Sequence, residues 1–211
     1  RSISKSVKIG KNTVVQPNCF IGNDVTIGNN CTIHSNVSIY DNTVIGDNVI
    51  IHANSVLGGS AFYYKNRPEG YDQLLSGGNV VIENNVDIGA SCTIDRGVSA
   101  STLIKEGTKI DNLVQIGHDT IIGKKCLIAS QVGIAGCVIV EDEVTIWGQV
   151  GITSGVTIGE KAIISAKSGV SKSLERDKRY FGIPADDFRS KYKEIAAIRK
   201  IPEIFEKLKK L

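Results

Sequence analysis

Residues 104–128 read IKEGTKIDNLVQIGHDTIIGKKCLI, and an isoleucine occupies every sixth position of this stretch. The same spacing continues to Val170 and also runs from Ile3 to Leu57 and from Ile82 to Ile94, always with Ile, Val or Leu. Because only 41% of the chain is hydrophobic, so uniform a column reflects a structural repeat. A fixed short period is typical of solenoids, in which each repeat buries its apolar side chain against its neighbours.

A second column lies two residues before the first, and it holds small or β-branched side chains such as Thr13, Cys31 and Val132. Residues two apart on a strand share one face, so both columns point inward. Three short strands then form one triangular coil, and residues 18 apart stack about 4.8 Å from one another. The pattern predicts a parallel β-helix. Glycine often follows the aliphatic residue, as at Gly10 and Gly28, which favours corners with positive φ.

Cysteine and histidine residues on this repeat have interpretations other than metal binding. The interior column contains Cys19, Cys31, Cys92 and Cys126, which indicates buried thiols in a reducing compartment. His34 and His52 are 18 apart and are predicted to stack. No third ligand follows them at close spacing, which favours a surface pair over a metal site.

Two segments interrupt the register. Residues 58–79 carry Phe62, Tyr63, Tyr64 and Tyr71, and they are interpreted as a flap over a cleft between subunits or as a trimer-contact loop. These two interpretations are compatible. A second, shorter interruption, GVSAST, occupies residues 97–102.

From Ala185 onward the apolar residues adopt helical spacing. We therefore expect a β-helix over residues 1–184, with the excursion at 58–79, and a helical extension over residues 185–211 in which Pro202 starts or kinks a second segment. The extension is predicted to cap the solenoid and pack against symmetry mates. Its basic residues also favour an acidic protein partner: Arg189, Lys191, Lys193, Arg199, Lys200, Lys207, Lys209 and Lys210.

Composition narrows the possible functions. A net charge of +3 argues against general nucleic-acid binding. No stretch approaches the ~20 apolar residues of a membrane span, and no signal peptide is visible. The chain starts at Arg1 and contains no Met, so we expect a fragment or a processed form.

The register predicts one candidate site. The corners that follow Ile94, Ile116, Ile134 and Ile152 belong to one edge of the prism, which brings His118 within one coil of Gly136. A general base beside a backbone N–H donor is the minimum arrangement for acyl transfer.

The segments CTIDRG (92–97), KIDNLVQIGHD (109–119), QVGIAG (131–136), GQVGI (148–152), SGV (168–170) and FGIPA (181–185) resemble UDP-3-O-acylglucosamine N-acyltransferases of the lipid A pathway. The resemblance extends from about residue 3 to the C-terminal helix. The related O-acyltransferases typically read IHRG and HIAHD at these places, so Asp95 and Gln115 look like the N-acyl branch.

This resemblance implies a left-handed β-helix that forms a homotrimer in the cytoplasm of a Gram-negative bacterium, with active sites in the grooves between subunits. The donor would be a (3R)-hydroxyacyl chain on the 4′-phosphopantetheine thioester of acyl carrier protein, with no other cofactor and no metal. The acceptor would be the 2-amine of a UDP-linked, O-acylated glucosamine.

The resemblance also suggests residue roles. His118 would be the general base, Asp111 or Asp119 would orient its imidazole, and the Gly136 N–H would stabilise the oxyanion. Asn112 and Gln115 would contact the sugar or the acyl 3-hydroxyl. Further substrate-binding candidates are Asp95, Phe62 and Gly155.

The chain departs from the family at two places. Gly155 stands where the family usually has a second His, which is thought to aid donor binding or the oxyanion. The family's N-terminal domain, which grips uracil, is expected to be missing because the hexad register already runs at Ile3. Two alternatives stay open: an acetyl-CoA-dependent nucleotide-sugar acetyltransferase, and a non-catalytic trimeric scaffold.

Overall fold

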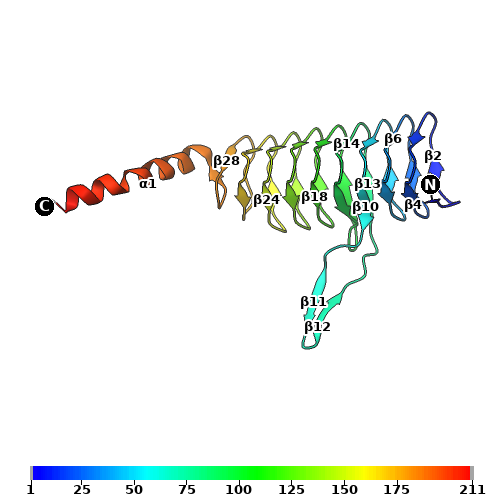
Figure 1. The fold of residues 1–211 in the computed structure, drawn as a ribbon, viewed down its shortest axis with the longest axis horizontal. Coiled ribbons are helices and arrows are strands. Elements are labelled where there is room, and N and C mark those ends of the chain that lie inside the picture. The colour runs from blue at the N-terminus through cyan, green and yellow to red at the C-terminus, as the bar shows by residue number, and fades with distance from the viewer. Residues whose placement is uncertain (1, 210–211) are drawn as a thin grey trace.

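The computed structural model describes residues 2–209 and confirms the predicted left-handed parallel β-helix (Figure 1). Its first face contains β1 (Ser2–Ile3), β4 (Phe20–Ile21), β7 (Ser38–Ile39), β10 (Val56–Gly59), β15 (Thr93–Asp95), β18 (Gln115–Ile116), β21 (Gly133–Ile134), β24 (Gly151–Ile152) and β27 (Gly169–Val170). The second face contains β2 (Lys8–Ile9), β5 (Thr26–Ile27), β8 (Val44–Ile45), β13 (Asn79–Ile82), β16 (Ser101–Ile104), β19 (Ile121–Ile122), β22 (Ile139–Val140) and β25 (Thr157–Ile158). The third contains β3 (Val14–Val15), β6 (Thr32–Ile33), β9 (Ile50–Ile51), β14 (Asp87–Ile88), β17 (Lys109–Ile110), β20 (Leu127–Ile128), β23 (Thr145–Ile146), β26 (Ile163–Ile164), β28 (Arg179–Phe181) and β29 (Asp186–Asp187).

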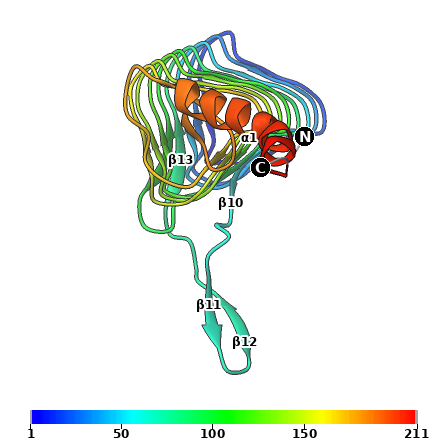
Figure 2. The same ribbon diagram turned by 90° about the vertical axis from the view of Figure 1, so that its left-hand side faces the viewer.

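The aliphatic column forms the core. Ile116 pairs with Ile134, and Ile134 pairs with Ile152, so residues 18 apart stack as predicted. All three are buried, as are the column residues of the other inner coils. Ile3 and Ile9 are exposed, because each has a neighbouring strand on one side only. Figure 2 looks along the axis and shows the coils sharing one outline.

The corners differ from the prediction in one respect. Positive φ occurs not at the glycine but two residues later, mostly at Asn or Asp, as at Asn12 and Asn30. These short polar residues tolerate the left-handed region better than most. Glycine is needed instead because the backbones of successive coils approach closely at this position. A Cβ on Gly10 would lie 2.5 Å from the carbonyl carbon of Gly28 in the next coil.

The four interior cysteines are buried, as predicted. Their thiols also donate hydrogen bonds to corner carbonyls of the next coil, with Cys126 Sγ 3.2 Å from the Glu141 oxygen. The Thr108 hydroxyl makes the same bond to the Gly123 carbonyl, at 2.7 Å. Burial raises the pKa of Cys126 to about 11, against hydrogen bonds that lower it.

The first interruption is a hairpin of β11 (Tyr64–Arg67) and β12 (Gly70–Gln73), which pair antiparallel and project from the solenoid (Figures 1 and 2). It leaves β10 on the first face and returns to β13 on the second. The second interruption connects β15 to β16, so it lies on the same edge. Both interruptions therefore occur where the candidate site was predicted.

The C-terminal extension forms one helix, α1 (Phe188–Leu208), whose first N–H groups are capped by the Asp187 carboxylate. The helix continues through Pro202, so Pro202 does not start a separate helix. Its first turns pack against β28 and β29, and it then extends away from the last coil with no buried residue (Figure 1). Lys210 and Leu211 lie outside the described residues. Within residues 2–209, no helix is both long and apolar enough to cross a bilayer.

Candidate active site

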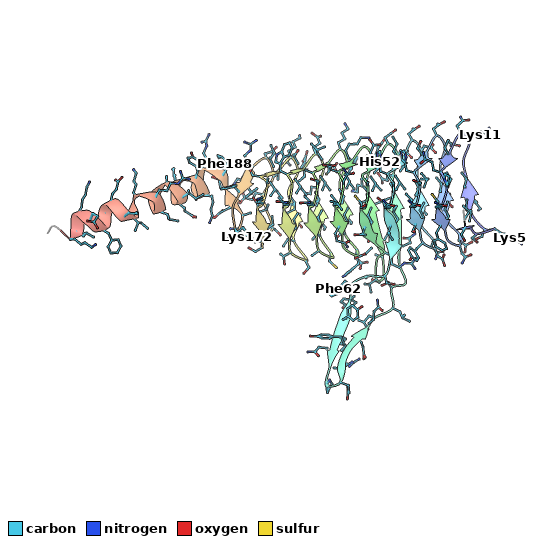
Figure 3. The ribbon with its side chains drawn as sticks, viewed as in Figure 1. Lys5, Lys11, His52, Phe62, Lys172 and Phe188 are labelled. Carbon is cyan, nitrogen blue, oxygen red and sulfur yellow. The ribbon has the colours of Figure 1, made fainter. Side chains whose placement is uncertain are left out.

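The edge between the first and second faces carries a cavity of about 580 Å³. Four successive corners contribute Asp95, His118, Gly136 and Gly155 to its lining, so the predicted column of corners is confirmed. Phe62 and Tyr63 line the same cavity, and Phe62 lies where the hairpin leaves the solenoid (Figure 3). The base of the hairpin therefore covers the site within a single chain.

His118 and Asp119 form the polar centre of this cavity. Nδ1 of His118 lies 2.9 Å from Oδ2 of Asp119, and the two side chains are 15% and 17% exposed. Asp119 is held by the second interruption: its carboxylate accepts hydrogen bonds from the Val98 N–H at 2.9 Å and the Ala100 N–H at 3.1 Å. Its own N–H donates to Thr102 Oγ1 at 2.9 Å. Regular hexads have no such inserted backbone.

These contacts fix the charge of Asp119. Burial raises its pKa, but the hydrogen bonds from the Val98 N–H, His118 and the Ala100 N–H outweigh that effect and lower it. The carboxylate is therefore ionised at neutral pH. An ionised carboxylate on Nδ1 favours the tautomer in which Nδ1 carries the proton and Nε2 has a free lone pair.

Gly136 lies directly against the other nitrogen of the imidazole. A Cβ at this position would be 2.5 Å from Nε2 of His118, so only glycine fits beneath the ring. Among residues 2–209, the Gly136 N–H has no hydrogen-bond acceptor. At a comparable corner, the Lys124 N–H donates to the Asp142 carboxylate at 2.8 Å. A base and an unused N–H donor thus meet on the cavity wall.

Gln115 and Asp95 form a second polar pair in the same cavity. Nε2 of Gln115 donates to Oδ2 of Asp95 at 3.0 Å, while its amide oxygen accepts a hydrogen bond from the Thr93 hydroxyl. Burial raises the pKa of Asp95, and the Gln115 hydrogen bond and the charge of His118 oppose this rise. The pair offers amide and carboxyl groups to a polar ligand.

Asp111 and Asn112 do not reach this cavity within the chain. They follow β17 on the third face, so they belong to a different edge of the prism from His118. The Asn112 side chain accepts the Ala90 N–H at 2.7 Å and so closes the corner of the preceding coil. The suggestion that Asp111 orients the imidazole is therefore wrong for a single chain, because Asp119 occupies that place.

Two residues at the site were not among the predicted candidates. The ring of Tyr63 is 5.5 Å from that of His118 and tilted by 52°. Cys137 is exposed, and its Sγ lies within 4.8 Å of ligating atoms of His118 and Asp119. Burial and the Asp119 charge raise the thiol's pKa. Tyr63 follows Phe62 in the sequence, and Cys137 follows Gly136. This adjacency to predicted site residues is the sequence signal that could have identified them.

Two other expectations concern the His34–His52 pair and the corner at Gly155. The rings of His34 and His52 stack as predicted, with centroids 4.8 Å apart and planes within 7°. Gly155 has φ +72° and open space where a side chain would project. A histidine there would have room, but it would need a backbone conformation that favours glycine.

Comparison with known sequences agrees with this architecture. The model for bacterial transferase hexapeptide repeats matches residues 24–59 and 101–136, and that for the hexapeptide repeat of succinyl-transferase matches residues 6–41 and 137–166. A UDP-3-O-acylglucosamine N-acyltransferase of Rhizobium meliloti is 46% identical over 141 residues, which cover 66% of this chain and 40% of that protein. One of Campylobacter lari is 43% identical over 129 residues, covering 61% and 40%.

Among solved structures, a UDP-N-acetylglucosamine acyltransferase of Francisella novicida superimposes with a TM-score of 0.80 at 27% identity, covering 97% of this chain and 76% of that one. The chain spans about two fifths of the length of the curated relatives it matches. Together, the two hexapeptide models match more than half of the chain. The chain therefore belongs to the hexapeptide-repeat transferases, and its β-helix is related to that of the UDP-3-O-acylglucosamine N-acyltransferases.

Proposed function

We propose that this chain is the β-helix and C-terminal helix of an N-acyltransferase that moves a (3R)-hydroxyacyl group from acyl carrier protein to the 2-amine of UDP-3-O-acylglucosamine. The observation that carries the proposal is the meeting of His118, oriented by Asp119, with the unused N–H of Gly136. The names of the related proteins support the reaction class.

The proposed reaction runs through a tetrahedral intermediate. The amine attacks the thioester carbonyl while Nε2 of His118 removes its proton, and the Gly136 N–H donates to the developing oxyanion. Collapse of the intermediate breaks the C–S bond, and the imidazolium returns its proton to the departing phosphopantetheine thiolate. Asp119 stabilises the imidazolium through Nδ1 and holds the ring in place.

Asp111 and Asn112 can bind the proposed substrate only if several chains assemble. These residues lie on another edge of the prism, so they can meet a substrate at His118 only from a neighbouring subunit. The proposal therefore includes a homotrimer with sites in the grooves between chains, where Gln115, Asp95, Phe62 and Gly155 would complete the pocket. The exposed lysines and arginines of α1 suit the acidic surface of a carrier protein.

The test is product analysis by mass spectrometry with the full-length protein. Acyl carrier thioesters of several 3-hydroxy chain lengths, and acetyl-CoA, are offered with UDP-3-O-acylglucosamine as acceptor. We expect an N-acylated product with a hydroxyacyl donor and its loss in His118→Ala. The matched control is His52→Ala, which removes a surface imidazole outside the cavity.

Each alternative has its own outcome in this experiment. Transfer from acetyl-CoA alone would replace the proposal with the acetyltransferase. Absence of product with every donor, from a folded protein, would leave the scaffold interpretation. Undiminished turnover by His118→Ala would disprove the mechanism.

A further inference from the structure

Arg96 connects the base of the hairpin to the coil on its other side. Its N–H donates to the Gly59 carbonyl at 2.9 Å, and its guanidinium Nε donates to the Gly58 carbonyl at 2.8 Å. Nη2 donates to the Asp41 carbonyl at 3.1 Å, in the preceding coil on the same edge. All three acceptors are backbone oxygens, and the arginine side chain forms no salt bridge among the described residues.

The returning stem of the hairpin is joined to the same segment. The Gly77 N–H donates to the Val98 carbonyl at 2.9 Å, and the Gly78 N–H donates to the Gly97 carbonyl at 3.0 Å. The two backbones pass so closely that a Cβ on Gly78 would lie 2.6 Å from the Gly97 carbonyl oxygen and closer still to that of Ala100. The two interruptions therefore form one interlocked unit.

The other end of this segment holds Asp119. Val98 and Ala100, whose N–H groups bind its carboxylate, follow Arg96 by two and four residues. Any displacement of the hairpin stems is thereby passed to the carboxylate on Nδ1 of His118. Because an arginine fork can bind carbonyls of two coils at once, lysine cannot replace it fully.

We propose that Arg96 is a positioning residue that couples the hairpin to the His118–Asp119 pair, so that the placement of the hairpin sets the orientation of the base. The expected effect on kcat rests on the proposed N-acyltransferase activity. The expected effect on the orientation of His118 does not. Arg96 itself touches no reacting atom; it acts through Val98, Ala100 and Asp119.

The experiment compares Arg96→Ala and Arg96→Lys with Arg176→Ala in the full-length protein. Arg176 is the matched control, because among the described residues its guanidinium pairs only with the half-buried Glu160 and the exposed Asp177, on the surface away from the cavity. We expect kcat to fall roughly 10- to 100-fold in Arg96→Ala, with the KM for the acceptor changed by less than about threefold. Arg96→Lys should be intermediate, Arg176→Ala unchanged, and added guanidinium should partly restore Arg96→Ala.

A second readout needs no turnover. Nitrogen-15 NMR of the histidine side chains reports the tautomer of His118, and we expect its Nδ1 and Nε2 signals to shift in Arg96→Ala while those of His34 and His52 stay in place. If the wild type proves inactive, this shift alone decides the coupling. Unchanged His118 signals in a folded Arg96→Ala protein, or kcat equal to that of the wild type, would overturn the proposal.

Discussion

Lys124 and Gly136 occupy equivalent corner positions in the repeat, but the two corners have different roles. At Lys124 the free N–H is closed by the Asp142 carboxylate from the next coil. At Gly136 no carboxylate arrives, because the next coil places Ser154 at the equivalent position, and the imidazole of His118 from the preceding coil lies against Gly136. The nearby carboxylate, Asp119, is held by inserted backbone and turned toward His118. The site thus combines an open corner, at Gly136, with an inserted segment that orients the adjacent histidine.

The largest effect should come from closing the open corner. In Gly136→Ala the new methyl would meet Nε2 of His118 at 2.5 Å, so the ring must move away from the N–H donor. We expect kcat to fall by about 10²- to 10³-fold, as when an oxyanion donor is lost. Lys124→Ala, at the closed corner, should leave steady-state kinetics unchanged. Full activity in Gly136→Ala would remove Gly136 and its N–H from the mechanism.

Replacing Asp119 by Asn should have the next largest effect. The amide keeps the shape, but its NH2 group faces an N–H donor, so one contact with Val98, Ala100 or His118 becomes repulsive. We expect kcat to decrease by roughly 10²-fold because the imidazole loses its tautomer and its charge partner. A decrease in acceptor affinity without loss of kcat would assign Asp119 to binding instead.

The pH dependence of stability provides a separate test of this carboxylate. A pKa lowered on folding means that Asp119 stabilises the native state above its unfolded pKa, near 4, and that this stabilisation disappears as pH falls through the lower folded value. Urea denaturation should therefore find the wild type more stable than Asp119→Asn at pH 7, with the difference shrinking below about pH 4. A constant difference from pH 7 to pH 3 would contradict the lowered pKa.

At the closed corner, Asp142→Ala should affect stability and not catalysis. It removes the acceptor of the Lys124 N–H, which costs about 1 kcal/mol of the free energy of unfolding for a partly exposed bond. Chemical denaturation measures this loss, and the acyl-transfer assay should show wild-type rates. A fall in kcat would mean that corners on separate edges are coupled.

The smallest perturbation concerns the thiols. Cys137 lies exposed at the open corner, whereas Cys19, Cys31, Cys92 and Cys126 are buried. Native protein treated with iodoacetamide should therefore gain one adduct per chain, at Cys137, as measured by peptide mass spectrometry. Labelling should accelerate with rising pH because the thiolate is the nucleophile, and the raised pKa of the Cys137 thiol should move this acceleration to higher pH than in an unfolded peptide. Adducts on interior cysteines would indicate that the coils open locally.

The repeat could be predicted from the sequence because one local rule, an aliphatic residue every six positions, determines every coil. That rule also placed His118 beside Gly136, since both lie at fixed offsets from Ile116 and Ile134. It could not place Val98 and Ala100 against Asp119, because inserted segments have no period. It also left Asp111 and Asp119 as equal candidates, although counting strands assigns Asp111 to another edge.

The interior column has a consequence for how such a chain can diverge. The inward-facing hydroxyls of Thr13, Ser55 and Thr108 and the thiols of Cys31 and Cys92 donate the same kind of bond. The acceptor is in each case the carbonyl that follows the aliphatic residue one coil on. Exchange among Thr, Ser and Cys at these positions keeps a small side chain and a hydrogen-bond donor. It should therefore change the stability of the fold very little. Such a chain could therefore gain or lose an oxidisable thiol at these positions without losing a hydrogen bond of its interior column.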